Sequence, residues 1–456
     1  MQTARTTKNR GWWLLIGLLL ILFYLAFAFY DGPHRYNDSA SYINMASSRE
    51  PMYPLFLWAV RLVFGGLGEA GWLQAAVVIQ SLIAALSALF FVRTLSESFS
   101  LSRLSDLALS FFAAAPSLMC RFVANRRMMY SNSVLSEALA IPLFLVFMTW
   151  LLRAAYVGGR RSFSRAAFWG FVLISVRKQM LITLPLLVLT ALWRGIKERR
   201  VFARLLSAVL LSAAVLLANN LLDRSYNYLV RGEFLRHTGD MRFVTTMLLY
   251  NAEPGDEQQI GDAELRALYL RIVEKADRQQ NLHSYAPRDW FGRAQYFTNN
   301  YDHIQFDCLR DVSREYVRAK TGGDELAETR ELDRINNALN AALLPVGKGR
   351  LLRTACDSFA VGLVTTVLSM NRHFVLPAAA LYAVYLALTV WCIAKKRERA
   401  ALFALLTLAA IGANLALVSL TIFCQARYTI YNMTLFYAAL FLLARELLPA
   451  GWKRAL

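Results

Sequence analysis

Acidic residues are scarce over most of this 456-residue chain. Residues 223–353 carry 19 Lys+Arg against 20 Asp+Glu, whereas the other 325 residues carry 31 Lys+Arg against only 11 Asp+Glu. The basic excess falls in short loops between apolar runs, which is the pattern of the positive-inside rule for membrane proteins. A membrane therefore accounts for the formal net charge of +19, and we expect no nucleic-acid partner.

Several chemical motifs are also absent. The five cysteines have no CxxC or other metal-ligand spacing, and the five histidines are scattered with no HExxH. The chain has no Walker loop, no GxGxxG before a strand and no GxSxG. These absences exclude a standard zinc site, ATP-driven transport by this chain, dinucleotide chemistry and a standard serine hydrolase. Cys308 and Cys356 leave two alternatives, a disulfide or two lone thiols.

Long apolar runs dominate the sequence, in which 57% of the residues are hydrophobic. A helix needs roughly 20 apolar residues to cross a bilayer. The predicted spans are 11–30, 72–95, 104–121, 133–154, 163–179, 180–195, 203–222, 374–394, 400–422 and 430–449. No small-residue cleavage site follows the first run, so we expect a retained span rather than a signal peptide. The fifth and sixth spans meet at Arg177-Lys178-Gln179, which predicts a tight helical hairpin.

The orientation follows from lysine and arginine. Basic clusters occur at residues 5–10, 153–165, 194–204, 395–399 and 453–454. With ten spans, all of these clusters lie on the side of the N-terminus, which we take as cytoplasmic. The sequence therefore predicts an all-α polytopic membrane protein with about ten transmembrane helices and both termini inside.

Two outer segments are too long to be plain connectors. The first, residues 31–71, contains two helix candidates, 39–46 and 53–64, and the second of these is apolar but too short to span. We expect juxtamembrane helices there, with 53–64 in the interface. The second outer segment, residues 223–372, is predicted to form a mostly helical extracytoplasmic domain.

That domain is predicted from helix-periodic charged stretches and a turn at Pro254-Gly255-Asp256. The stretches are 263–278, 306–320 and 325–344. The chain then divides into a seven-helix module (1–222), the outer domain (223–372) and a three-helix C-terminal module (373–456).

Two carboxylates outside the large domain stand out as candidates for catalysis. Asp38 follows the first span and opens a helix, and Glu137 begins the fourth span at its outer end. Either residue also fits a structural role, Asp38 as a helix cap and Glu137 through the helix dipole. The loop before Glu137 carries Arg126 and Arg127, and acids and bases gathered in this way indicate a site for an anionic ligand.

Basic residues recur at the outer turns, against the topology rule. They are Arg177 and Lys178 between the fifth and sixth spans, Arg372 before the eighth, and Arg427 with Tyr428 on the last turn. One interpretation is snorkelling toward lipid phosphates. The other is a phosphate clamp, because arginine presents a planar bidentate fork and lysine a point charge.

This pattern resembles the GT-C class of integral-membrane glycosyltransferases, which includes protein O-mannosyltransferases and lipid A aminoarabinose transferases. The resemblance rests on an Asp soon after the first span, two helices in that loop, and seven spans before a large outer loop. The run Arg49-Glu50-Pro51-Met52-Tyr53-Pro54 is similar to the R-x-P-x-Y-P stretch of many bacterial members. Ser136-Glu137 and Arg427-Tyr428 also stand where such members have similar residues. Several relatives carry paired acids in the first loop, whereas Ser39 follows Asp38 here.

The resemblance implies inverting transfer of a sugar from a polyprenyl-phosphate donor to a lipid, glycan or protein acceptor outside a bacterial inner membrane. In this interpretation Asp38 and Glu137 are catalytic, and no cofactor is certain, with Mg or Mn as an open alternative. The predicted donor-phosphate contacts are Arg177, Lys178, Arg372, Arg427, Arg126 and Arg127. The predicted substrate contacts are Tyr42, Glu50 and Tyr428.

Two functions of other classes are alternatives. A secondary transporter or lipid flippase would be expected to carry ionisable residues near the bilayer midplane and broken helices in related halves. The sequence has mostly apolar mid-span residues and no matching halves. A non-catalytic polysaccharide assembly factor would use the outer domain to bind a partner and would not require Asp38.

Overall fold

The computed structural model describes residues 10–123 and 128–449, and within them it is helical without a named strand. Eight helical segments are long and apolar enough to cross a membrane among these residues. The chain is therefore a polytopic helical membrane protein, as the apolar runs predict. Two of the ten predicted spans, at 104–121 and 163–179, form helices that are not among the eight. The full count of ten and the orientation stay predictions.

The chain separates into two compact units. The first comprises residues 1–236, 376–413 and 430–456, and the second comprises 237–375 and 414–429. The predicted domain boundary at Asp223 falls inside a helix that continues to Arg231.

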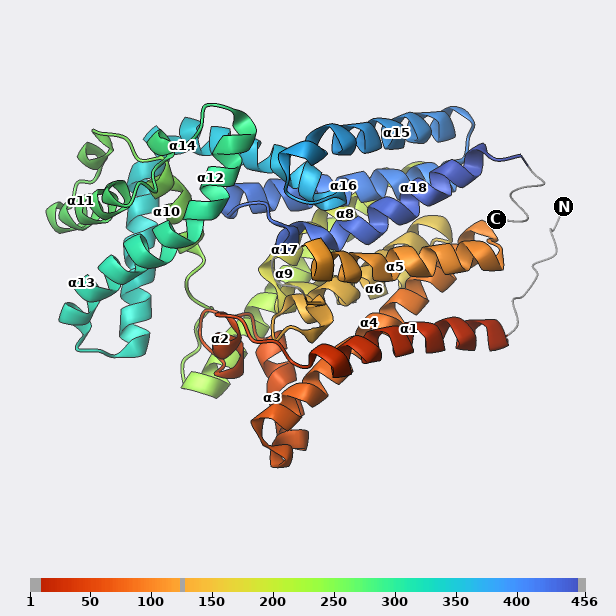
Figure 1. The fold of residues 1–456 in the computed structure, drawn as a ribbon, viewed down its shortest axis with the longest axis horizontal. Helices are drawn as coiled ribbons and strands as arrows, with labels where there is room; N and C mark the ends of the chain where they lie inside the picture. The colour runs from red at the N-terminus through yellow and green to blue at the C-terminus, as the bar shows by residue number, and fades with distance from the viewer. Residues whose placement is uncertain (1–9, 124–127, 450–456) are drawn as a thin grey trace. The chain divides into compact units, whose positions relative to one another are not determined.

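The first unit contains most of the helices that are labelled in Figure 1. Its helices before the second unit are α1 (Arg10–Asp31), α2 (Ser39–Ile43), α3 (Met52–Phe64), α4 (Gly68–Phe99), α5 (Arg103–Val123), α6 (Glu137–Tyr156), α7 (Arg160–Val176), α8 (Thr183–Glu198) and α9 (Val201–Arg231). The chain returns to it in α15 (Val375–Ala394), most of α16 (Glu398–Thr421) and α18 (Met433–Leu447). Helix α4 packs against α1 and α6, and α7 packs against α6 and α9.

Lipid explains the apolar surface of this unit. Along α1, Leu14, Leu18 and Leu22 are about half exposed or more, and along α9 Leu210 and Leu217 are equally open. Rows of exposed leucine on long helices are unfavourable in water but suit a hydrocarbon environment. The outer surface of α1 and α9 therefore fits a bilayer rather than solvent.

The predicted helices of the first loop are present. Candidate 39–46 is the shorter α2, and candidate 53–64 is α3. Pro51 and Pro54 lie at the start of α3, where backbone N–H groups have no partner within the helix, so the missing proline donors cost little. The prolines thus end the loop and begin α3.

The second unit is a helical domain with its own core. Its helices are α10 (Met241–Tyr250), α11 (Ala263–Arg278), α12 (Trp290–Asp302), a π-helical segment (His303–Arg310), α13 (Asp311–Thr321), α14 (Glu325–Val367) and α17 (Ala426–Thr429). The core includes Tyr250, Phe297, Tyr301 and Leu339, all at most 2% exposed. This unit is helical, as predicted for residues 223–372, and its extracytoplasmic location stays a prediction.

The structure of this unit shows the predicted turn and the state of two cysteines. The Pro254-Gly255-Asp256 turn is present, and Arg350 of α14 clamps it through both oxygens of Asp256, at 2.6 and 2.8 Å. Cys308 is a buried free thiol and Cys356 an exposed one. The two cysteines are therefore lone thiols in the structure and do not form a disulfide with each other.

Gly362 allows a close contact between α14 and two side chains. A Cβ built on Gly362 would lie 2.6 Å from Leu415 Cδ2 and 2.9 Å from Cys424 Sγ. We expect Gly362→Ala to destabilise the protein by about 1–3 kcal/mol through overpacking, measured as a lower unfolding temperature in detergent.

Gly349→Ala on the same helix is the matched control. A Cβ at Gly349 meets nothing within 4 Å, and alanine is a better helix former than glycine by roughly 0.5–1 kcal/mol. The control should raise the unfolding temperature slightly. If both variants unfold at the same temperature, the close packing at Gly362 does not matter for stability.

Candidate functional site

Asp38 occupies the cap position of α2, but its side chain does not cap the helix. No side-chain cap hydrogen bond is formed at this position. Instead, Oδ1 of Asp38 pairs with the Arg49 guanidinium at 2.7 Å. The helix-cap interpretation of Asp38 therefore lacks its defining contact. The carboxylate is 29% exposed, so it is both held and accessible.

Arg49 organises the first loop around Asp38. Its Nε donates to Ser41 Oγ at 2.7 Å, and its Nη1 donates to the Tyr42 hydroxyl at 3.3 Å. The guanidinium also lies over the Tyr42 ring, 4.5 Å from the ring centre, an arrangement of cation and π face that is attractive. Burial disfavours the charge of Arg49, but Tyr42 and Asp38 beside it hold the pKa of the guanidinium above its ordinary value.

The backbone of this loop is fixed by a different residue, Ser39. Its hydroxyl accepts from the Tyr36 amide at 2.8 Å and donates to the Val134 carbonyl at 2.9 Å. His34 and Ser133 form an isolated backbone bridge nearby. These contacts join the first loop to the segment before α6, so the position of Asp38 is set without use of its own carboxylate.

Glu137 is fully buried at the start of α6 and has a cationic partner. Its Oε1 pairs with Nη1 of Arg177 at 2.8 Å, and its Oε2 accepts from Ser136 Oγ at 3.3 Å. Arg177 is extended and separates α7 from the 3-10 turn Lys178–Ile182, which confirms the predicted hairpin turn. The Arg177 side chain, 13% exposed, is the partner of Glu137 rather than an open phosphate clamp.

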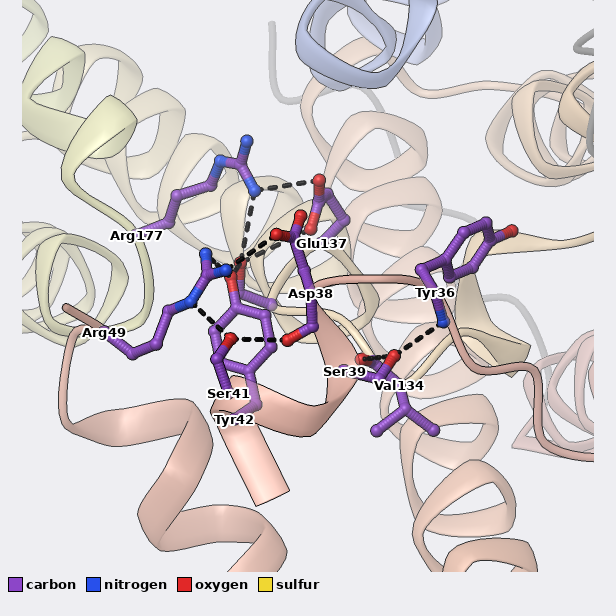
Figure 2. A network of polar contacts seen from close by, with 10 residues as sticks. Tyr36, Asp38, Ser39, Ser41, Tyr42, Arg49, Val134, Glu137 and Arg177 are labelled. Carbon is purple, nitrogen blue, oxygen red and sulfur yellow. Dashed lines mark hydrogen bonds and ion pairs between the residues drawn. The ribbon is translucent and has the colours of Figure 1, made fainter. Parts of the chain in front are cut away.

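The two ion pairs belong to one polar network. The Tyr42 hydroxyl lies 3.0 Å from Ser136 Oγ, which also accepts from Arg177 Nη1 at 3.2 Å. Figure 2 shows Arg49 and Arg177 extending toward the two carboxylates, with the Tyr42 ring beside Arg49. Burial raises the pKa of the Tyr42 hydroxyl, the charge of Glu137 raises it further, and the charge of Arg49 offsets only part of the rise. Tyr42 therefore stays protonated at neutral pH and connects the pairs.

A third contact ties in the turn between α7 and α8. The backbone amide of Lys178 donates to Oε1 of Glu50 at 3.2 Å. The first loop, the start of α6 and this turn thus meet, although they are far apart in the sequence. Glu50 and Tyr42 were predicted to contact substrate, and in the structure both hold these segments together.

The other predicted site residues lie elsewhere. Arg372 pairs with Asp289 at 2.5 Å, and the Arg427 guanidinium lies 5.7 Å from the Tyr428 ring centre. These four residues belong to the second unit. Arg126 and Arg127 lie outside the described residues. Among the residues that the structure describes, no group of three or more His, Cys, Asp or Glu side chains is arranged to hold a metal ion.

Arg49 is the residue whose importance the sequence did not reveal. In the sequence it stands out only as the first residue of the Arg49-Glu50-Pro51 run. The available signal is its position, since it is one of the few basic residues that share the first outer segment with Asp38. Its pairing with a carboxylate 11 residues earlier depends on the bend between α2 and α3, which residue spacing alone does not give.

Comparison with models of known protein families, with curated proteins and with solved structures finds no match.

Proposed function

We propose that the protein is an integral-membrane glycosyltransferase of the GT-C type. It would transfer a sugar from a polyprenyl-phosphate donor to an acceptor hydroxyl on the extracytoplasmic side of a bacterial inner membrane, with inversion at the anomeric carbon. The observation that carries the proposal is the Asp38 carboxylate, which is oriented by Arg49, not used as a cap, and partly exposed.

Asp38 is assigned the role of general base. It takes the proton of the acceptor hydroxyl as that oxygen forms a bond to the anomeric carbon. The bond from that carbon to the donor phosphate oxygen breaks, and its electron pair leaves with the lipid phosphate. A single displacement of this kind inverts the configuration of the sugar.

The leaving phosphate gains negative charge, so fixed cations lower the barrier. Arg49 is assigned here to orient Asp38. Lys178, at the turn that Glu50 joins to the first loop, is the cation we assign to the donor phosphate. Glu137 and Arg177 keep the start of α6 and the turn in place.

The proposal is tested with the purified full-length protein in nanodiscs. Labelled polyprenyl-phosphate sugars are supplied with lipid, glycan and protein acceptors, and transfer is measured together with the configuration of the product. Label transferred with inversion supports the proposal. Movement of intact donor across the membrane without transfer would favour a flippase instead.

Arg49→Gln should change the pH dependence of transfer. Arg49 favours the ionised form of the nearby carboxylate, so its removal should move the acid limb of the rate profile to higher pH. Arg49→Lys keeps a cation, so its acid limb should move less than that of Arg49→Gln. A purely structural role would lower the rate at every pH and leave the shape of the profile unchanged.

A further inference from the structure

A pocket of about 380 Å³ lies within the second unit. It is walled by residues of α10, α12 and α14, which pack against one another, and by the loop before α12. Its volume falls in the range of roughly 300–1,000 Å³ that is usual for small-molecule sites. Three arginines line it, Arg288, Arg293 and Arg353, against a single acid, Asp357.

The acid does not oppose an anion in this pocket, because its charge is already matched. Nε of Arg293 lies 2.6 Å from Asp357 Oδ2, and Nη2 lies 3.0 Å from Oδ1. This bidentate pair is the strongest common geometry for guanidinium and carboxylate. The third nitrogen of Arg293 donates to the Arg288 carbonyl, which fixes the loop in place.

The other two arginines are left with uncompensated charge. In the part of the chain that the structure describes, no acidic side chain pairs with Arg288 or Arg353, and both are exposed. The nearby acids are engaged by other cations, since Glu253 and Asp256 pair with Arg350, and Asp289 pairs with Arg372. The pocket therefore presents two guanidinium groups to a ligand.

An imidazole and two neutral polar groups complete the lining. Nδ1 of His283 is buried with no hydrogen-bond partner among the described residues, while its Nε2 lies 3.6 Å from Glu253. Burial raises the pKa of Tyr250, so this phenol stays neutral. Thr354 is held by Asn251 at 2.9 Å. A buried polar atom without a partner is costly unless a ligand or water satisfies it.

We infer that this pocket binds a phosphate monoester. Such a group carries about −1.5 to −2 charge near neutral pH and three acceptor oxygens, which matches two guanidinium forks and an imidazole nitrogen. A carboxylate has two oxygens and one charge, and would leave one cation unmatched. The inference does not rest on the proposed sugar transfer, because every residue that carries it lies in the second unit.

The test is a titration of the full-length protein in nanodiscs with glucose 1-phosphate, glucose and glucuronate as probes. Only glucose 1-phosphate should bind. The double variant Arg288→Gln/Arg353→Gln should weaken its affinity by roughly tenfold or more, since charge-assisted contacts are lost. Dodecyl phosphate is the second phosphate probe. If dodecyl phosphate binds more tightly than glucose 1-phosphate and the difference depends on Arg288 and Arg353, the natural ligand is a lipid-borne monoester. If glucose 1-phosphate binds more tightly, the natural ligand is a soluble monoester.

Arg271→Gln/Arg278→Gln is the matched control. Both arginines are exposed on α11 in the same unit, so the control removes equal charge outside the pocket and should bind glucose 1-phosphate as the parent does. Equal loss in both double variants would overturn the inference, and so would equal binding of glucuronate or no binding by the parent. Arg353→Lys, which retains the charge, should keep part of the affinity and guards against misfolding.

Discussion

Asp38→Asn is expected to reduce sugar transfer by about 10²- to 10⁴-fold, the usual contribution of a positioned general base. Asparagine has nearly the same shape and can still accept from Arg49 through its amide oxygen. It cannot take a proton from the acceptor. The rate constant should therefore fall much more than the affinity for the donor, measured by initial rates over a range of donor concentrations.

Glu69→Gln is the control for this substitution. Glu69 is an exposed carboxylate of the first unit that pairs with Arg35, and the change removes the same charge in the same way. Its transfer rate should equal that of the parent protein. A folded Asp38→Asn variant with near-parental turnover would remove Asp38 from the base role and would favour a non-catalytic assembly factor.

The largest loss of stability is expected for Arg177→Ala. The substitution leaves the fully buried Glu137 carboxylate without its cation at 2.8 Å. Breaking a buried ion pair from one side costs about 3–5 kcal/mol, because an uncompensated charge stays in a poorly solvated place. Thermal unfolding in detergent should show a clear decrease in the midpoint. The double variant Glu137→Gln/Arg177→Ala should recover part of it, since no charge is then stranded.

Arg93→Ala tests whether the loss of stability in Arg177→Ala arises from the burial of the ion pair. Arg93 pairs with Glu97 on α4 at 2.8 Å, but both side chains are more than half exposed. Exposed pairs contribute little to stability, so the unfolding midpoint should hardly change. Equal losses for Arg93→Ala and Arg177→Ala would show that the Glu137–Arg177 pair gains nothing from its buried position.

The sequence predicts elements well where composition changes sharply. The prolines at the start of α3 and the basic turn between α7 and α8 both mark real breaks. It fails where packing overrides a local signal. The predicted helix 325–344 stops before Pro345, yet α14 runs through it to Val367. The proline removes one backbone hydrogen bond, and buried residues beyond it, such as Ala355 and Val361, carry the helix on.

The candidate site was likewise predictable only in part from the sequence. Asp38, Glu137 and Arg177 are recognisable because polar residues are conspicuous among apolar ones. Which side chains pair with one another is not recognisable, because pairing depends on how separate helices approach. The link from Tyr42 to Ser136 spans 94 residues, and no periodicity within one helix contains that information.

The contact between Glu50 and the Lys178 amide also determines when the site can form during synthesis of the chain. These residues lie 128 positions apart, and a ribosome adding about 5–20 residues per second needs roughly 6 to 26 s to cover that distance. Throughout this interval the first loop has been synthesised but lacks its last anchor. The site is therefore complete only after α7 has emerged, and in chains whose translation is arrested before that point Glu50 should react faster with a carboxylate-labelling reagent than in the complete protein.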